Sequence, residues 1–358
     1  MDGPVTARPP AARSGKDGKA ATKTVNLALQ GGGSHGAFTW GVLDRILEDG
    51  RLGFEGISGT SAGAVNGALL AYGMLTDGRE GARELLYRLW RRLAKTTVFS
   101  PLQPTLLDRW TGNPHLDHSP IYAGLDLMVR VMSPYQFNPL GLNPMRNIIQ
   151  GLIDFEVLRE AADTRLYVSA TNVTRGTLKV FSRGELSAEC LIASACLPFL
   201  VQAVEIDGEY YWDGGYMGNP TIYPLIHDCR ASDVVVVQVT PIQRPELPTT
   251  PTAIVDRINE ISFNSTFLRE LRAMELVNRL VKSQKLTEEE AGVRAINLHM
   301  VSAADRMAAL GTSSKLNGDW GFLTELRDLG RAAAQDWLDG TFERIGRESS
   351  VELGRQFV

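Results

Sequence analysis

The chain has 358 residues, of which 44% are hydrophobic and 22% charged, and its formal net charge at pH 7 is −4. This composition is typical of a globular protein whose core fills one large or two ordinary domains. The slightly acidic balance excludes a sequence-wide basic field, so we expect no nucleic-acid partner. The three cysteines, Cys190, Cys196 and Cys229, lack C-x-x-C spacing. They favour small buried side chains in a reducing compartment over a disulfide framework or a zinc site.

Residues 1–24 are rich in Ala, Pro, Gly and Lys and contain no apolar block of the length that a signal peptide needs. We interpret them as a disordered arm that precedes a single domain over 25–350. No uninterrupted apolar run approaches the roughly 20 residues of a membrane-spanning helix. We therefore expect a cytoplasmic protein that touches a membrane peripherally at most.

The first regular unit lies in the segment VNLALQGGGSHGAFTWG, residues 25–41. An apolar run over 25–30 predicts a buried strand, and helical spacing over 37–48 predicts a helix that Asp49-Gly50 ends. Between them, Gly31, Gly33 and Gly36 satisfy G-x-G-x-x-G. Such a turn exposes backbone N–H groups that suit either a pyrophosphate or a transient oxyanion.

A second unit repeats this order, with a short strand near 56–58 and a helix over 62–74. The turn between them reads Gly59-Thr60-Ser61-Ala62-Gly63, which is a G-x-S-x-G in the strand-turn-helix context that the motif requires. Its two glycines allow the sharp turn that exposes the Ser61 hydroxyl, so Ser61 is the candidate nucleophile. Strand-turn-helix twice over predicts a parallel sheet.

The stretch 96–160 changes character, because seven prolines fall between Thr96 and Asn147. We expect no regular element among so many prolines, and we interpret the stretch as a lid or pocket wall. Its apolar side chains are hypothetical contacts for an acyl chain: Leu102, Leu106, Leu107, Tyr135 and Phe137.

Regular structure is expected to resume after the insertion. Strands are predicted over 166–171, 178–182, 234–240 and 295–301, the third of them central because its β-branched run is unbroken. In the C-terminal region, 253–350, apolar spacing predicts a long amphipathic helix over 254–281, which we expect to cover the sheet, and a last helix near 320–345.

A serine nucleophile needs a base, and the five histidines offer weak candidates. The five are His35, His115, His118, His227 and His299. His299 lies in an apolar strand-like segment typical of a core histidine, and His115 and His118 lie in the proline-rich insertion. The alternative is Asp213 in Tyr211-Trp212-Asp213-Gly214-Gly215, although an aspartate before two glycines is usually a turn.

The three motifs GGGSHG, GTSAG and WDGG occur in the order and at the separations of the patatin-like phospholipases, a family that the segment over 25–240 resembles. The resemblance implies a three-layer α/β/α fold with a mainly parallel central sheet. It also implies lipid acyl hydrolysis without a cofactor or metal, with an acyl-ester substrate. Ser61 would attack the ester, Asp213 would take its proton, and Gly31, Gly32 and Gly33 would hold the oxyanion. The remaining motif glycines would support these turns: Gly36, Gly59, Gly63, Gly214 and Gly215.

One departure from the family pattern concerns the substrate. Family members commonly carry Arg or Lys where this chain has His35, so a permanent cation is replaced by a group expected to titrate near neutrality or by an ordinary helix-start residue. Phospholipid, neutral acylglycerol and storage polyester all stay open as substrates.

Two other classes of function also stay open. A dinucleotide-binding oxidoreductase would need an acidic residue near the end of the second strand. Glu55 has roughly that spacing, but the end of the strand is taken by the serine turn. The other class is a catalytically silent lipid-binding protein. The oligomeric state is not predicted.

Overall fold

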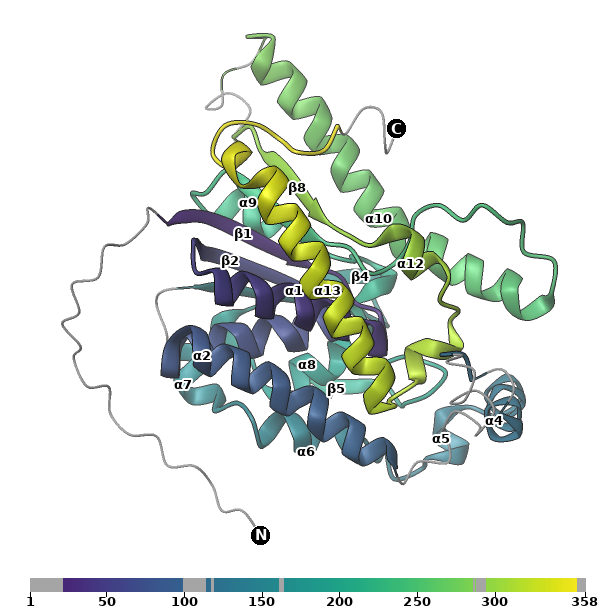
Figure 1. The fold of residues 1–358 in the computed structure, drawn as a ribbon. Helices are drawn as coiled ribbons and strands as arrows, with labels where there is room; N and C mark the ends of the chain where they lie inside the picture. The colour runs from purple at the N-terminus through teal and green to yellow at the C-terminus, as the bar shows by residue number, and fades with distance from the viewer. Residues whose placement is uncertain are drawn as a thin grey trace.

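The computed structural model describes residues 22–98, 114–116, 119–160, 164–285, 287 and 294–352. Within them, eight strands form one mixed sheet in the order β5-β6-β3-β2-β1-β7-β8, with β4 paired to β3. The pairs β1–β2, β2–β3, β1–β7 and β7–β8 are parallel, whereas β3–β4, β3–β6 and β5–β6 are antiparallel. The α/β fold with a mainly parallel sheet is therefore confirmed (Figure 1).

The two predicted strand-turn-helix units are present. They comprise β1 (Lys23–Leu29), η1 (Gly33–His35), α1 (Gly36–Asp49), β2 (Leu52–Thr60) and α2 (Ala62–Val98). The left-handed Gly50 ends α1, as the sequence predicts. Non-helical backbone at Asp77 and Gly78 divides α2 into two helical parts, so the expected helix over 62–74 is followed by a second one that the pattern did not reveal.

Four of the remaining strands lie at or within a few residues of the predicted ranges: β3 (Arg165–Asn172), β4 (Thr177–Ser182), β7 (Asp233–Val237) and β8 (Asn297–Val301). Two further strands, β5 (Val204–Ile206) and β6 (Glu209–Asp213), were not predicted. The short elements between and after them are η2 (Arg183–Glu185), α8 (Ala188–Ser194), η3 (Gly214–Tyr216), α9 (Tyr223–Asp228), α12 (Ala304–Ala308), η4 (Ser313–Leu316) and η5 (Phe342–Arg344).

Alternating residues of the central strands enter two hydrophobic clusters, one on each face of the sheet. Leu27, Leu29 and Val237 belong to the larger cluster, with α1, α2, α8 and α13 (Trp320–Thr341). Ala28 and Val236 belong to the smaller one, with α9 and α10 (Pro251–Lys282). Helices thus cover both faces, which gives the expected three layers (Figure 1).

The proline-rich insertion corrects the sequence analysis, because regular elements do form there. They are α4 (Pro120–Val131), α5 (Pro134–Phe137), α6 (Pro144–Gln150) and α7 (Phe155–Glu160). The first three begin with a proline after a Ser or Asn N-cap. Proline fits the first helical position, where its missing N–H would have had no intrahelical partner and its fixed φ suits the helix. These prolines therefore start helices instead of excluding them.

The long helix α10 covers the sheet with only part of its length. Phe267, Leu271 and Met274 are buried in the smaller hydrophobic cluster. Nearer its N-terminus, Ile254 and Ile258 are exposed. The predicted helix is confirmed, but its apolar spacing serves the core only in the C-terminal half.

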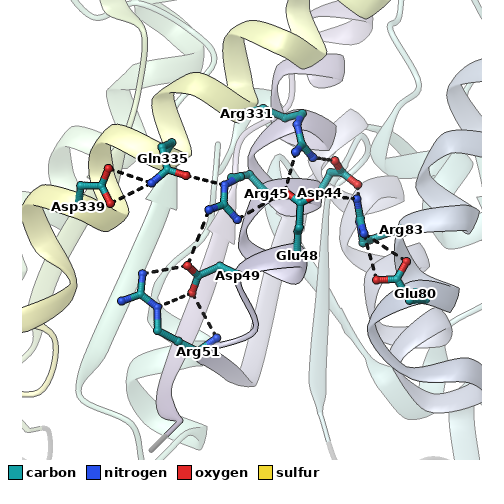
Figure 2. A network of polar contacts seen from close by, with 10 residues as sticks. All are labelled: Asp44, Arg45, Glu48, Asp49, Arg51, Glu80, Arg83, Arg331, Gln335 and Asp339. Carbon is teal, nitrogen blue, oxygen red and sulfur yellow. Dashed lines mark hydrogen bonds and ion pairs between the residues drawn. The ribbon is translucent and has the colours of Figure 1, made fainter. Parts of the chain in front are cut away.

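A network of charged side chains joins α1 to α2 and α13 on the outer surface (Figure 2). At its centre, Asp44 on α1 accepts hydrogen bonds from Arg83 Nε at 2.8 Å and from Arg331. Glu48 contacts the same two arginines. Beneath the network α1 and α13 lie so close that a Cβ at Gly41 would collide with the carbonyl of Arg327. The network holds three helices over the larger core.

Candidate active site

Strand β3 brings Ser61 and Asp213 together. One edge of β3 pairs with β4, and the opposite edge pairs with two strands in turn. The first part of that edge pairs with β2 and ends with Ser169 beside Thr60. The next part pairs with β6 and begins with Ala170 beside Asp213. Ser61 directly follows Thr60, so the two candidate catalytic residues lie at the point along β3 where its partner changes from β2 to β6. The carboxyl end of the sheet, where β1, β2 and β7 end, therefore carries both.

Ser61 has a backbone conformation typical of an exposed nucleophile at a sharp turn. Its φ is +54°, in the left-handed region that non-glycine residues rarely adopt. The turn is held by the Ser61 N–H, which donates to Ser194 Oγ at 2.8 Å, and by the start of α2, where Val65 N–H donates to the Ser61 carbonyl at 3.2 Å. This strand-to-helix turn confirms the predicted structural context of G-x-S-x-G.

Asp213 is a buried carboxyl whose protonation is shifted toward neutral pH. It is 1% exposed, and this burial raises its pKa to about 6, against the opposing effects of the Gly215 N–H, the Ser61 side chain and the charge of Lys315. Gly215 N–H donates to Asp213 Oδ1 at 2.7 Å, and the Ser61 side chain lies near enough to lower the pKa of the carboxyl. A base with a pKa near the working pH is suited to accept a proton from Ser61.

The motif glycines allow the turns around this pair to approach one another. A Cβ at Gly31 would lie 2.6 Å from the Ser61 Cβ, and one at Gly63 would collide with the Leu29 carbonyl. A Cβ at Gly214 would collide with the Ser169 carbonyl. Gly36, Gly59 and Gly215 are crowded in the same way, by Ala62, Gly63 and Phe263 respectively. All these glycines are therefore required by packing around Ser61 and Asp213.

The three glycines expected to hold the oxyanion differ in what their N–H groups do. Gly31 N–H donates to the buried Asn219 Oδ1 at 2.7 Å. Within the described residues, the N–H groups of Gly32 and Gly33 donate to no acceptor, and Gly33 has a φ of +59°. Asn219, four residues after the WDGG motif, is a supporting residue that the sequence analysis missed.

His35 agrees with one of its two interpretations, that of an ordinary helix-start residue, because it directly precedes α1. It is 3% exposed, and its burial, followed by the charges of Lys315, Arg244 and His115, lowers its pKa well below the usual value. Its Nε2 lies 2.7 Å from Ser314 Oγ, and that hydroxyl donates to the Gly311 carbonyl at 2.7 Å. The only hydroxyl proton is thus used, so His35 donates from Nε2. It therefore connects η1 to η4 as a neutral side chain, and the lowered pKa speaks against the alternative interpretation, a group that titrates near neutrality.

His299 is the middle residue of β8, and it contacts Asp233 at the start of β7. It is 0% exposed, its Nε2 is 2.9 Å from Asp233 Oδ1, and its Nδ1 is 3.1 Å from Ser350 Oγ. Asp233 also accepts from the Gly346 N–H at 2.8 Å. The pair Asp233–His299 therefore fixes the C-terminal segment to the sheet, in agreement with a core histidine.

The other candidate residues lie apart from the nucleophile. Glu55, considered as a ribose ligand, accepts the N–H groups of Arg230 and Ala231 at 2.8 and 2.7 Å in the amino half of β2. His115 Nδ1 accepts the Gly311 N–H at 3.4 Å, and His227 lies on α9. His118 is outside the described residues. Among the residues that are described, no cluster of three metal-ligating side chains occurs.

The expected acyl contacts are only partly covered by the structure. Leu102, Leu106 and Leu107 lie outside the described residues. Tyr135 is 57% exposed and accepts the Ala203 N–H at 3.3 Å, whereas Phe137 is partly buried. A cavity of about 460 Å³ beside α8 is lined by Arg146, Gln202 and neighbouring residues, but by neither Ser61 nor Asp213. The acyl pocket stays a prediction.

A membrane-spanning segment is not found in the part of the chain that the structure describes, because no helix there combines enough length with enough apolar character.

Comparisons with known proteins bear on the family. The patatin-like phospholipase family model matches residues 27–226, more than half of the chain. A search of curated proteins returns no match. Among solved structures, VipD from Legionella pneumophila is 17% identical over 87% of this chain and 67% of that chain, with a TM-score of 0.35. ExoU–SpcU from the type III secretion system of Pseudomonas aeruginosa is 20% identical over 69% and 51%, with a TM-score of 0.33. By its family match, this chain belongs to the patatin-like phospholipases, a family of lipid acyl hydrolases.

Proposed function

We propose that the protein hydrolyses carboxylic esters of lipids through a covalent acyl-enzyme on Ser61, with Asp213 as the base. The observation that carries this proposal is the pairing of a strained Ser61, at φ +54°, with a buried Asp213 whose pKa is about 6. The membership in the patatin-like family supports the same chemistry.

In the proposed first step, Ser61 Oγ attacks the ester carbonyl while its proton passes to Asp213. The carbonyl oxygen becomes an oxyanion, which the free N–H groups of Gly32 and Gly33 stabilise. Gly31 has its N–H engaged by Asn219 and positions the turn instead. Loss of one oxyanion donor typically costs about 3 to 4 kcal/mol of transition-state stabilisation.

The intermediate collapses when the C–O bond of the leaving alcohol breaks and that alkoxide takes the proton from Asp213. Water then attacks the acyl-enzyme, gives its proton to Asp213, and the acid departs as Ser61 recovers its proton. Each proton therefore moves through one carboxyl, and no histidine is required. His35 stays neutral and engaged with Ser314 during these steps.

The test is a panel of lipid classes with matched acyl chains, covering phospholipids, lysophospholipids, acylglycerols and a storage polyester. Wild-type protein and Ser61→Ala are compared, with Ser350→Ala as the matched control serine at the other end of the sheet. We expect release of fatty acid by the wild type and the control only. Equal turnover by Ser61→Ala, or lipid binding without turnover by the wild type, would reject the proposal.

The expected peripheral membrane contact stays a prediction. Exposed apolar side chains on α4 and on the N-terminal half of α10 are suited to it: Ile121, Leu127, Val131, Ile254, Val255, Ile258 and Ile261. On α10 their spacing forms one stripe along the helix. Co-sedimentation of Ile258→Asp with lipid vesicles, compared with wild type, tests whether this stripe contributes.

A further inference from the structure

The segment 218–222, which we call the strap, is held by buried polar side chains from β2, from β3 and from the residue after β1. Gln30 Nε2 donates to the Asn219 carbonyl at 3.0 Å, and Thr60 Oγ1 donates to the Gly218 carbonyl at 2.7 Å. Buried polar groups are unfavourable unless they are hydrogen-bonded, so the strap and its partners fix one another in place. The side chains that hold the strap are all 0% exposed: Gln30, Ser58, Thr60 and Ser169.

Asn219 is the residue of the strap that contacts the glycine turn. It is 0% exposed, and its Oδ1 accepts the Gly31 N–H at 2.7 Å. A backbone N–H can only donate, so the amide atom that faces it is the oxygen, and the orientation of the side chain is fixed. Asn219 Nδ2 is buried and donates to no acceptor in the part of the chain that the structure describes. The bond to Gly31 is thus what the side chain contributes.

The strap is also connected to the nucleophile and to the base. Thr60, which donates to the strap at Gly218, directly precedes Ser61. At the other end, the Gly218 N–H donates to the Gly214 carbonyl at 2.9 Å, and Gly214 directly follows Asp213. One run of buried contacts therefore joins the glycine turn, the nucleophile turn and the base.

We infer that Asn219 is a positioning residue for the hydrolysis, because its bond to Gly31 holds the glycine turn in a fixed place relative to Asp213 and the nucleophile. The free N–H groups of that turn are then aimed at the ester carbonyl before the substrate arrives. This inference rests on the proposed function and adds that the base and the oxyanion donors are held as one unit. A misplacement of about 1 Å in such a site costs on the order of 100-fold in rate.

The kinetic experiment compares Asn219→Leu with a control that loses another buried amide. Asn219→Leu removes the acceptor of the Gly31 N–H and also the unpaired Nδ2, so the number of unpaired buried donors at this place does not change. In the control, Asn26→Leu, a fully buried residue of β1 loses its bond to the Ala231 carbonyl. We expect kcat to fall about 100-fold in Asn219→Leu with KM nearly unchanged, and the control to keep its kcat within about threefold.

Fluorophosphonate labelling separates positioning from a loss of folded protein. A merely structural role lowers the fraction of Ser61 that is labelled, whereas a positioning role lowers the rate at which the folded fraction reacts. We expect a rate about 100-fold lower in Asn219→Leu and a recovery to within about tenfold of wild type in Asn219→Asp, which keeps an acceptor oxygen. A wild-type rate in Asn219→Leu would overturn the inference, and so would the absence of any recovery in Asn219→Asp.

Amide hydrogen exchange tests the contact without turnover and without a variant. In protein labelled at glycine and observed by NMR, the Gly31 N–H should exchange slowly in wild type and in Asn26→Leu, and at least about tenfold faster in Asn219→Leu. Rapid exchange of Gly31 in the wild type would overturn the inference even if Asn219→Leu does not fold. If the wild type neither cleaves an ester nor reacts with the fluorophosphonate, the proposed function fails, whereas the exchange still decides whether Asn219 holds the turn.

Discussion

Two buried aspartates lie at opposite ends of the same sheet, and they have opposite electrostatic surroundings. At the carboxyl end, burial dominates and raises the pKa of Asp213 to about 6. At the amino end, burial of Asp233 is outweighed by hydrogen bonds from His299 and the Gly346 N–H, and its pKa is lowered. An aspartate with few hydrogen-bond donors around it has a raised pKa and is suited to accept a proton. An aspartate whose oxygens are fully hydrogen-bonded stays ionised and stabilises the fold.

The amino end of the sheet looks more like a familiar catalytic triad than the proposed active site does. Ser350, His299 and Asp233 form a serine-histidine-aspartate chain with contacts of 3.1 and 2.9 Å. That histidine is completely buried, however, and the serine belongs to the C-terminal segment that lies against β8, where Ser350 N–H donates to the Leu298 carbonyl at 3.0 Å. We therefore propose the active site from the position of Ser61 at the carboxyl end of the sheet and from its strand-to-helix turn, and not from residue identity alone.

The largest expected effect is on turnover. Asp213→Asn removes the proposed base with little change in shape, and we expect kcat/KM for ester hydrolysis to fall by roughly 10³ to 10⁴-fold. Asp233→Asn, assayed well below its melting temperature, should keep kcat/KM within a few-fold of wild type. Steady-state kinetics on one lipid ester measures both variants. Similar losses of kcat/KM in Asp213→Asn and Asp233→Asn would contradict a catalytic role for the carboxyl end of the sheet alone.

The second effect is on stability at the amino end of the sheet. Asp233→Asn weakens a buried, charge-assisted contact with His299, so we expect the free energy of unfolding to fall by about 2 to 3 kcal/mol. The lowered pKa means that this stability is present above the unfolded-state pKa of Asp and is lost as the pH falls through the folded-state value. Urea unfolding at neutral pH and at acid pH measures it; a wild-type-like curve for Asp233→Asn would count against the structural role.

The third effect is on stability at the carboxyl end, where the pH dependence has the opposite sign to that of Asp233. Because the pKa of Asp213 is raised to about 6, the folded protein binds a proton at this carboxyl more tightly than the unfolded chain does. The associated stability is present below the unfolded-state pKa and is lost as the pH rises to about 6. Asp213→Asn should therefore be more stable than wild type above that pH, by the order of 2 kcal/mol, while it loses activity. A destabilised Asp213→Asn at pH 8 would mean that the carboxylate is better paired than the structure indicates.

The same raised pKa predicts the pH dependence of catalysis. The base must be ionised, so kcat/KM should rise with pH up to about 6 and level off above it. A pH–rate profile on an uncharged ester measures the acid limb. An acid limb centred near the usual pKa of an exposed aspartate would contradict a buried base.

The smallest effect is expected for the charged network of α1, α2 and α13, which belongs to neither end of the sheet (Figure 2). Asp44→Ala removes one of the two carboxylates that Arg83 and Arg331 share, and leaves them Glu48. Ion pairs near the surface contribute little, so we expect a loss of about 1 kcal/mol of stability and no change in kcat. Thermal unfolding beside a turnover assay measures both, and a large loss of activity would show that this face communicates with the site.

Much of this arrangement could be predicted from the sequence. The order of strands, glycine turns and helices around Ser61 follows from short-range patterns, and the two glycine turns are in contact because parallel neighbours end together. Asp213 was a candidate base because the histidines were weak candidates, but an aspartate before two glycines is by itself an ordinary turn, and the family resemblance supplied its role. Its place beside Ser61 depends on β3 pairing with β2 and then with β6, which no local pattern reveals.

The parts that sequence reasoning missed depend on tertiary contacts. The prolines of the insertion stand at helix starts, which only the N-cap residues before them indicate. The Gly31 N–H is taken by Asn219, and Lys315 reaches the glycine turn from 282 positions further along the chain than Gly33. Such long-range placements leave no periodicity or spacing in the sequence.

The central claim is tested most directly by covalent labelling with a fluorophosphonate, followed by mass spectrometry of the labelled peptide. The account predicts one adduct, on Ser61, formed at the wild-type rate in Asp233→Asn and roughly 10³-fold more slowly in Asp213→Asn. An adduct on Ser350, or equal labelling rates in Asp213→Asn and wild type, would contradict it.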